Sequence, residues 1–258
     1  MELSSYMAAA SLASGAIVGL LLSLFGGGGS VLAAPLLLYF VGLSDAHLAI
    51  GTSAAAVAAN AVMALIAHAR AARVKWPCAS VFAAAGLLGA WVGSSLAKSI
   101  DGKHLLLAFA TAMAAIAVSM WRRGHKEGDP KVQLTRHLAA RLAPIGLATG
   151  AAAGFFGIGG GFLIVPGLIS ATGMTLANAA ASSLVSVALF GVTTSVNYAL
   201  AGWVDLRIAA LLVLGGLLGS AIGMRFVRIF ERKFVIANRL FAGLILLVAA
   251  YVAWRALS

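Results

Sequence analysis

Apolar residues occur along this chain in long runs, without the alternation of a half-buried strand or the single stripe of a surface helix. Eight of the runs reach about 18 residues or more, the length that a helix needs to cross a bilayer. The ten apolar segments are Met7–Phe25, Val31–Val41, Ala46–Ala69, Pro77–Ala97, His104–Trp121, Ala139–Phe156, Phe162–Ser170, Leu176–Ala201, Leu206–Met224 and Phe234–Ala256. This pattern predicts an all-α polytopic membrane protein.

Two of the ten segments, Val31–Val41 and Phe162–Ser170, are too short to span a membrane as helices. They would measure only about 15–20 Å, against a hydrocarbon core of about 30 Å. We interpret them as half-helices or as arms of re-entrant hairpins. Because re-entrant backbone is tolerated only inside protein or beside a cavity, these are the places where a functional site is expected.

The composition supports a membrane protein and argues against other classes. Hydrophobic residues make up 62% of the 258 residues and charged residues 10%, whereas soluble domains have about 45–50% and about 25%. Such a chain does not fit a soluble enzyme, a disordered tail or a fibrous protein. Cys78 is the only cysteine, so neither an internal disulfide nor a CxxC redox pair can form.

The net charge of +11 indicates membrane orientation, not nucleic-acid binding. Basic residues gather in short loops between apolar segments, as the positive-inside rule predicts for cytoplasmic loops. The three basic loops are His68–Trp76, Trp121–Arg141 and Arg225–Lys233. All three lie in the cytoplasm if the first two segments together return to their starting side. Both termini then lie outside the cytoplasm.

The chain also repeats itself, with an offset of about 130 residues. Three pairs of stretches match: Gly15–Gly19 with Gly150–Gly154, Phe25–Ser30 with Phe156–Gly161, and Leu87–Gly93 with Leu217–Gly223. Because each half holds five segments, an odd number, the halves must be inverted relative to each other in the membrane. We therefore divide the chain into a first transmembrane repeat (1–121), a basic cytoplasmic loop (122–138) and a second transmembrane repeat (139–258).

The two glycine runs are the main candidates for a binding site. Glycine lowers helix propensity, so each run is predicted to be the unwound tip of a hairpin. The short arm then begins with free N–H groups and a positive dipole end, which suit an anion. The alternative is a tight turn that holds no ligand. The candidate substrate-binding residues in the runs are Gly28, Gly29, Ser30, Gly159, Gly160 and Gly161.

Hydroxyl side chains in two long segments extend this candidate site. They belong to Thr52, Ser53, Ser182 and Ser183. With Ser44 and Thr175 as predicted N-caps, they fall about 9 Å inside the helices. Their hydroxyls either complete the coordination of an oxyanion or bond a carbonyl of their own or a neighbouring helix.

Charged side chains are absent from the middle of all ten segments. No carboxylate pair, histidine cluster or HExxH motif is present, so we expect no enzyme activity, no metal and no cofactor. A site without fixed charge must use backbone N–H groups, helix dipoles and hydroxyls, which favours a small anion. The amides of Asn60 and Asn197 have no counterparts in the repeat, and we interpret them as helix–helix hydrogen-bonding groups.

The duplicated motifs have a specific order. A Gly-rich break with a following Pro (Phe25–Pro35 and Phe156–Pro166) precedes a Thr/Ser-Ser pair and a Gly-x-x-Gly-x-x-x-Gly helix. This order resembles the sulfite exporter TauE/SafE family, also called the 4-toluene sulfonate uptake permease superfamily. The resemblance covers nearly the whole chain and is weakest over Arg122–Arg141 and the last segment. Ala181-Ser182-Ser183 stands where a Thr-Ser pair is more typical, which leaves selectivity open.

The resemblance implies a multi-pass permease of the bacterial inner (cytoplasmic) membrane. Its substrates would be small sulfur-containing anions such as sulfite or organosulfonates, with export commoner than import. We expect alternating access of two inverted repeats in the lipid bilayer, with no nucleic-acid partner. A passive anion channel and a non-transporting membrane scaffold stay open as alternatives, as does a homodimer.

Overall fold

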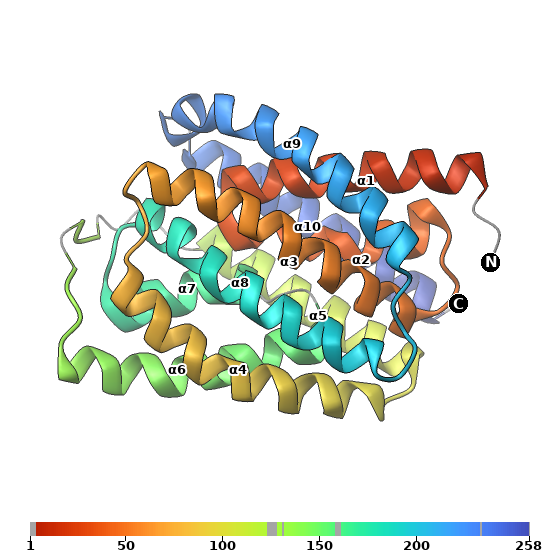
Figure 1. The fold of residues 1–258 in the computed structure, drawn as a ribbon, viewed down its shortest axis with the longest axis horizontal. Helices are drawn as coiled ribbons and strands as arrows, with labels where there is room; N and C mark the ends of the chain where they lie inside the picture. Colours follow the sequence, from red (N-terminus) through yellow and green to blue (C-terminus); the bar gives the residue numbers. More distant parts are fainter. Residues whose placement is uncertain (1–3, 123–127, 131, 158–160, 233, 258) are drawn as a thin grey trace.

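Long helices that run roughly along one axis build the fold in the computed structural model (Figure 1). The structure describes residues 4–122, 128–130, 132–157, 161–232 and 234–257. Within these ranges the only β-type pairing is a single bridge between Asp129 and Met174. Apart from the short elements between α1 and α3, the described helices are α1 (Ser5–Phe25), α3 (Ala46–Arg70), α4 (Trp76–Lys98), α5 (Gly102–Arg122), α6 (Arg136–Phe156), α7 (Gly161–Thr172), α8 (Leu176–Ala199), α9 (Leu206–Arg232) and α10 (Phe234–Leu257).

Eight helices in the described ranges are long and apolar enough to cross a membrane, which confirms the predicted fold class. The two segments predicted to be too short are short in the structure as well. The first is a composite of η1 (Gly26–Leu32, a 3₁₀ helix), α2 (Ala33–Pro35) and η2 (Leu36–Val41, a π-helix). The second is α7, which has 12 residues.

The N-caps of α3 and α8 occupy equivalent places in the two halves. Thr175 accepts a hydrogen bond from the Asn178 N–H, as predicted. The predicted cap Ser44 is wrong by one residue, because the Asp45 carboxylate accepts from the His47 and Leu48 N–H groups instead. A carboxylate is an equally good N-cap, and its charge also complements the helix dipole.

The chain passes along the bundle so that the two termini lie at the same end (Figure 1). The α3–α4, α5–α6 and α9–α10 connections lie at the opposite end, so the three basic loops share one end of the molecule. We call the first end the termini end and the second the basic end. The figure also shows α1 running towards the basic end and α6 running away from it. Which end faces the cytoplasm stays a prediction.

Glycines bring helices of the two halves into backbone contact. A methyl group at Gly15 or Gly19 of α1 would overlap the α9 backbone at Leu212 or Gly216. In the same way, Gly146 and Gly150 of α6 lie directly on the α4 backbone at Phe82 and Gly86. Small residues allow such close approach, which maximises packing where no hydrophobic effect drives helices together. Each pair joins one helix of the first half to one of the second.

These contacts correct the register of the repeat. The sequence pairs Gly15–Gly19 with Gly150–Gly154, whereas the contacts pair it with Gly146–Gly150, one helical turn earlier. Three glycines at four-residue spacing in α6, Gly146, Gly150 and Gly154, make both alignments look equally good in the sequence. Only the opposing backbone distinguishes them.

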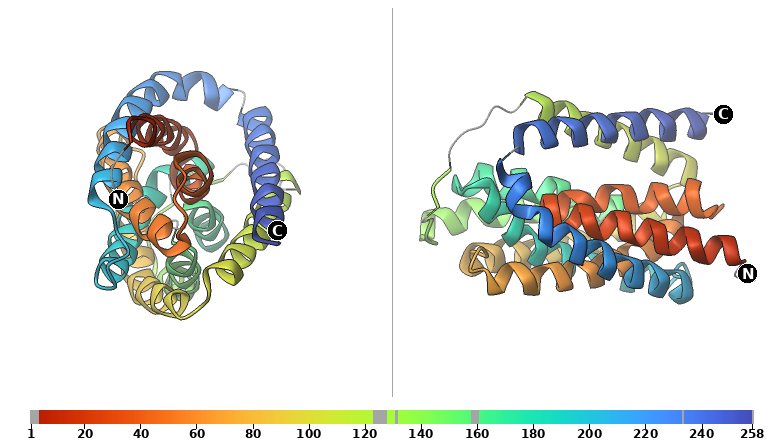
Figure 2. Two further views of the ribbon diagram at one scale, coloured as in Figure 1. Left: turned by 90° about the vertical axis from the view of Figure 1, so that its right-hand side faces the viewer. Right: turned by 90° about the horizontal axis from the view of Figure 1, so that it is seen from above.

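Helices α5 and α10 pack against each other at the side of the bundle (Figure 2). Two aromatic pairs contribute to their contact with the rest of the bundle, together with the buried Val31 and Leu32 of η1 and a Tyr39–Tyr251 pair. Phe25 stacks on Phe241 with ring centroids 4.1 Å apart, and Phe156 lies 6.1 Å from Phe109. Phe25 and Phe156 directly precede the two glycine breaks. The α5–α10 pair therefore rests on the ends of α1 and α6.

The glycine contacts predict a clear difference between two Gly→Ala variants. Gly19→Ala should lower the free energy of unfolding by about 1–3 kcal/mol, because its methyl group overpacks the α1–α9 contact. Gly243→Ala in α10 has no heavy atom closer than 4.0 Å to the new carbon and should be neutral or stabilising. Thermal unfolding of both purified variants in one detergent measures the difference. Equal stability of the two would refute the packing role.

Candidate functional site

The first glycine run interrupts the helix without unwinding completely. Gly26 ends α1 with φ +62°, a backbone conformation that L side chains rarely adopt. The chain then winds as the 3₁₀ helix η1, which contains the predicted residues Gly28, Gly29 and Ser30. The predicted unwound tip is thus a tight helical turn. Gly29 lies against the α1 backbone at Leu21 and Leu22, so the short arm folds back closely on α1.

The second run begins in the same way. Gly157 caps α6 in the left-handed region with φ +65°, and its N–H donates to the Gly154 carbonyl. The predicted site residues Gly159 and Gly160 lie outside the described residues. Gly161 is the first residue of α7. Each break is therefore opened by a glycine with positive φ, 131 residues apart.

The two breaks meet in the interior of the bundle. A side-chain carbon at Gly161 would overlap Gly27, and one at Gly27 would overlap Gly161 and Val187. Around this contact, each break lies against the equivalent helix of the other half. Gly26 lies on the backbone of Ala180 in α8, and Gly157 lies against Ile50 in α3. The structure thus brings the two predicted glycine sites to one place.

The serines of the candidate site are fully buried and hydrogen-bonded to backbone. Ser30 Oγ donates to the Gly27 carbonyl at 2.8 Å, so its hydroxyl is engaged within η1. Ser53 and Ser183 each donate to the carbonyl three residues earlier, at 3.0 and 2.8 Å. Ser183 Oγ also accepts from the Gly27 N–H at 3.2 Å. In the described part of the chain, Ser183 is the predicted hydroxyl that contacts the opposite glycine break.

Thr52 and Ser182 contact helix starts in the opposite half. Thr52 Oγ1 accepts from the N–H of Asp205, the residue before α9, at 2.9 Å. Ser182 Oγ accepts from the N–H of Lys75, the residue before α4, also at 2.9 Å. The donors are 130 residues apart and so are the acceptors. Thr52 thus connects the halves at the start of α9 and Ser182 at the start of α4, and each is the sequence neighbour of a serine of the candidate site.

The neighbours of the described glycines of the breaks are uncharged: Ala180, Val187 and Ser183 at the first break, and Ile50 at the second. Two ion pairs between described residues lie at the termini end, one between His47 and Asp45 and one between His104 and Asp101. The described residues contain no group of three His, Cys, Asp or Glu side chains that could hold a metal ion. Polarity at the breaks therefore comes from backbone groups, hydroxyls and helix ends.

Both predicted intramembrane amides join helices. Asn60 Nδ2 of α3 donates to the Leu212 carbonyl of α9 at 3.4 Å. Asn197 Nδ2 of α8 donates to the Ser94 and Ser95 hydroxyls of α4 at 2.7 and 2.8 Å. The predicted role in helix–helix hydrogen bonding is confirmed for both residues.

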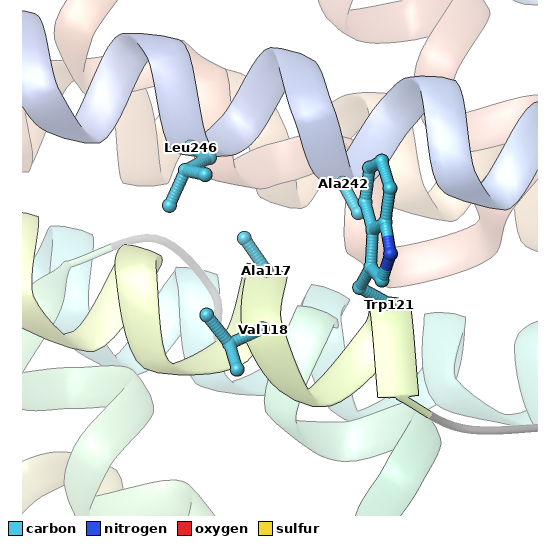
Figure 3. Close-up of a pocket in the computed structure, with 5 residues that line it drawn as sticks. All are labelled: Ala117, Val118, Trp121, Ala242 and Leu246. Carbon is cyan, nitrogen blue, oxygen red and sulfur yellow. The ribbon is translucent and has the colours of Figure 1, made fainter.

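A cavity of about 160 Å³ lies between α5 and α10, away from the glycine breaks (Figure 3). Its walls are apolar, apart from the indole N–H of Trp121. The lining residues are Ala117, Val118, Trp121, Ala242 and Leu246. Such a lining offers little to a small anion and suits hydrocarbon.

Comparison with known proteins shows the family. The sequence pattern of the family described as sulfite exporter TauE/SafE matches residues 11–252. The chain belongs to this family. A probable membrane transporter protein of Xylella fastidiosa (strain 9a5c) is 46% identical, over 95% of this chain and 94% of the relative. The probable membrane transporter protein YdhB of Bacillus subtilis (strain 168) is 25% identical, over 90% and 96% respectively.

The resemblance seen in the motifs is therefore confirmed, and this TauE/SafE protein is a multi-pass membrane transporter. The names of these relatives describe transporters, and none of them describes an enzyme. No solved structure gives a significant match.

The inter-half hydrogen bond of Thr52 predicts a stability difference. Thr52→Val leaves the Asp205 N–H without its acceptor and should cost about 1–3 kcal/mol of unfolding free energy. Thr52→Ser keeps the hydroxyl and should stay close to the parent. Thermal unfolding in detergent compares the three proteins. A valine variant as stable as the serine variant would contradict this role.

Proposed function

We propose that this transporter carries small sulfur oxyanions or organosulfonates and binds the sulfo group at the two glycine breaks. The observation that carries the proposal is the contact of Gly27 with Gly161, where two glycine-opened helix starts meet among uncharged neighbours. Helix starts present unpaired N–H groups and a positive dipole end, which together attract anions.

Backbone recognition also supports selectivity for a small anion. An oxyanion offers several acceptor oxygens to N–H and hydroxyl donors, whereas a cation would face the positive ends of two short helices. In the structure, Ser183 Oγ accepts the hydrogen bond that the Gly27 N–H donates. An anion that replaces this hydroxyl receives the N–H of Gly27 and the hydroxyl of Ser183 together. Thr52, Ser53, Ser182 and the remaining glycines of the breaks complete the proposed site region.

The close contact of the breaks implies that binding requires movement. Gly27 and Gly161 leave no room for even one methyl group between them, so the substrate enters only after they separate. The glycine-packed pairs α1–α9 and α4–α6 are the natural rigid units. We infer that alternating access is a motion of these two pairs around α3 and α8. The opposite directions of α1 and α6 support inverted repeats (Figure 1).

The proposed direction is export across the bacterial inner membrane. It rests on the family description and on the three basic loops at one end, which the positive-inside rule assigns to the cytoplasm. Both termini then face away from the cytoplasm.

Exchange flux separates a carrier from the two alternatives. In proteoliposomes, uptake of labelled sulfite or sulfoacetate should saturate with concentration. Uptake should also accelerate when unlabelled anion is present inside, because a carrier reorients across the membrane faster with bound substrate than without it. Flux that neither saturates nor shows this exchange would indicate a channel. Absence of any anion flux, with normally folded protein, would indicate a scaffold.

Ser183→Ala tests the site itself. Removing the hydroxyl should raise the half-saturation concentration for the anion about tenfold, as expected for one lost hydrogen bond to a charged group. Ser170→Ala is the matched control, because Ser170 Oγ bonds only the Gly167 carbonyl of its own helix. The same half-saturation concentration for the anion in both variants would contradict the proposed site.

A further inference from the structure

A polar cluster joins α4 to α8 at the termini end of the bundle. Asn197 of α8 is 2% exposed and uses every polar atom of its side chain. Its Nδ2 donates to the hydroxyls of Ser94 and Ser95, and its Oδ1 accepts from Lys98 Nζ at 2.6 Å. Lys98 also donates to the Asn197 carbonyl at 3.1 Å. We call these four residues the polar lock.

The charge of Lys98 makes the lock stronger than ordinary helix–helix hydrogen bonds. Among the described residues no carboxylate pairs with Lys98, so the ammonium depends on the two oxygens of Asn197. Hydrogen bonds to an ionised donor are shorter and about twice as strong as neutral ones. The Asn197 carbonyl lies in the last turn of α8, where orphan carbonyls need donors and a cation also favours the helix dipole.

The lock has no counterpart in the other half of the repeat. The positions 130 residues away are Ala67 for Asn197, Met224 for Ser94 and Arg225 for Ser95. The position equivalent to Lys98 is Arg228, but Ala67 has no polar side-chain atom, so the amide of the lock is not repeated. Some inter-half bonds do occur in equivalent pairs, as Thr52–Asp205 and Ser182–Lys75, whereas the position equivalent to Asn60, which bonds Leu212, is Phe190. Both amides therefore break the repeat symmetry, and Asn197 does so at the termini end.

We propose that Lys98 and Asn197 are positioning residues that hold the termini end of the transporter closed. The proposal rests on the alternating-access mechanism proposed above. Helices α4 and α8 are joined by the neutral Ser182–Lys75 hydrogen bond on the side of the basic end and by the charged lock at the termini end. Opening at the basic end breaks the neutral Ser182–Lys75 bond, which is weaker than the charged bonds of the lock. Opening at the termini end requires the bonds between Lys98 and Asn197 to break, so the resting protein is open to, or opens first towards, the basic end.

Two buried reporter cysteines test this asymmetry without any substrate. In a Cys78→Ala background, Ala97→Cys reports on the termini end and Ala64→Cys reports on the α3 segment nearer the basic end. Both alanines are 0–1% exposed, so each cysteine reacts with a membrane-impermeant thiol reagent only when its end opens. Labelling rates are measured in proteoliposomes with reagent applied to each side in turn.

Asn197→Ala should accelerate labelling of the Ala97→Cys reporter about tenfold and slow labelling of the Ala64→Cys reporter, because the equilibrium shifts between two states. Asn197→Asp gives Lys98 a carboxylate partner. It should therefore slow labelling of the Ala97→Cys reporter and accelerate labelling of the Ala64→Cys reporter. Lys98→Gln removes the charge and should resemble Asn197→Ala, so it carries the test if that variant does not fold.

Opposite shifts at the two reporters support the lock. Faster labelling at both ends would show loss of packing only, and unchanged rates at both ends would show that the cluster does not set the equilibrium; either result overturns the proposal. Because no substrate is used, the outcome is separate from that of the flux experiments. Missing sulfite flux with opposite labelling shifts would remove the proposed substrate and leave the lock in place.

Discussion

The hydrocarbon core of a bilayer offers no partner to a backbone that leaves helical geometry, and this constraint governs both glycine breaks. The protein supplies the partners from its other half. Ser183 accepts from the N–H of Gly27, and Ser182 and Thr52 accept from the residues that begin α4 and α9. Each half therefore completes the hydrogen bonding of the other, and the fold depends on both together.

This mutual hydrogen bonding places polar groups at the interface between the two halves. Glycines allow α1 to lie on α9 and α6 to lie on α4, and these pairs carry the two breaks towards each other. What remains at the crossing is backbone, hydroxyl groups and helix ends, with Phe25 and Phe156 covering it towards α5 and α10. Such a site favours an anion, because oriented N–H groups and positive helix ends supply the attraction that a lysine or arginine side chain would otherwise provide.

The sequence predicted the segments and the fold class, because hydrophobic length is a local property of the chain. It also located the two breaks, whose glycines stand out from their surroundings. The register of Gly15 and the cap Ser44 were wrong, since a neighbouring glycine or carboxylate fits the local pattern equally well. The partners of Thr52 and Ser182 lie more than 100 residues away, so no local signal could reveal them. The Lys98–Asn197 bonds were missed for the same reason.

An experimental structure in lipid nanodiscs with bound sulfoacetate would test most directly whether the anion is held without a buried cation. The account predicts density for the sulfo group within hydrogen-bonding distance of backbone N–H groups at the glycine breaks, beside Ser183, with Gly27 and Gly161 moved apart. Density for the anion against a lysine or arginine side chain, with the Gly27–Gly161 contact unchanged, would contradict it.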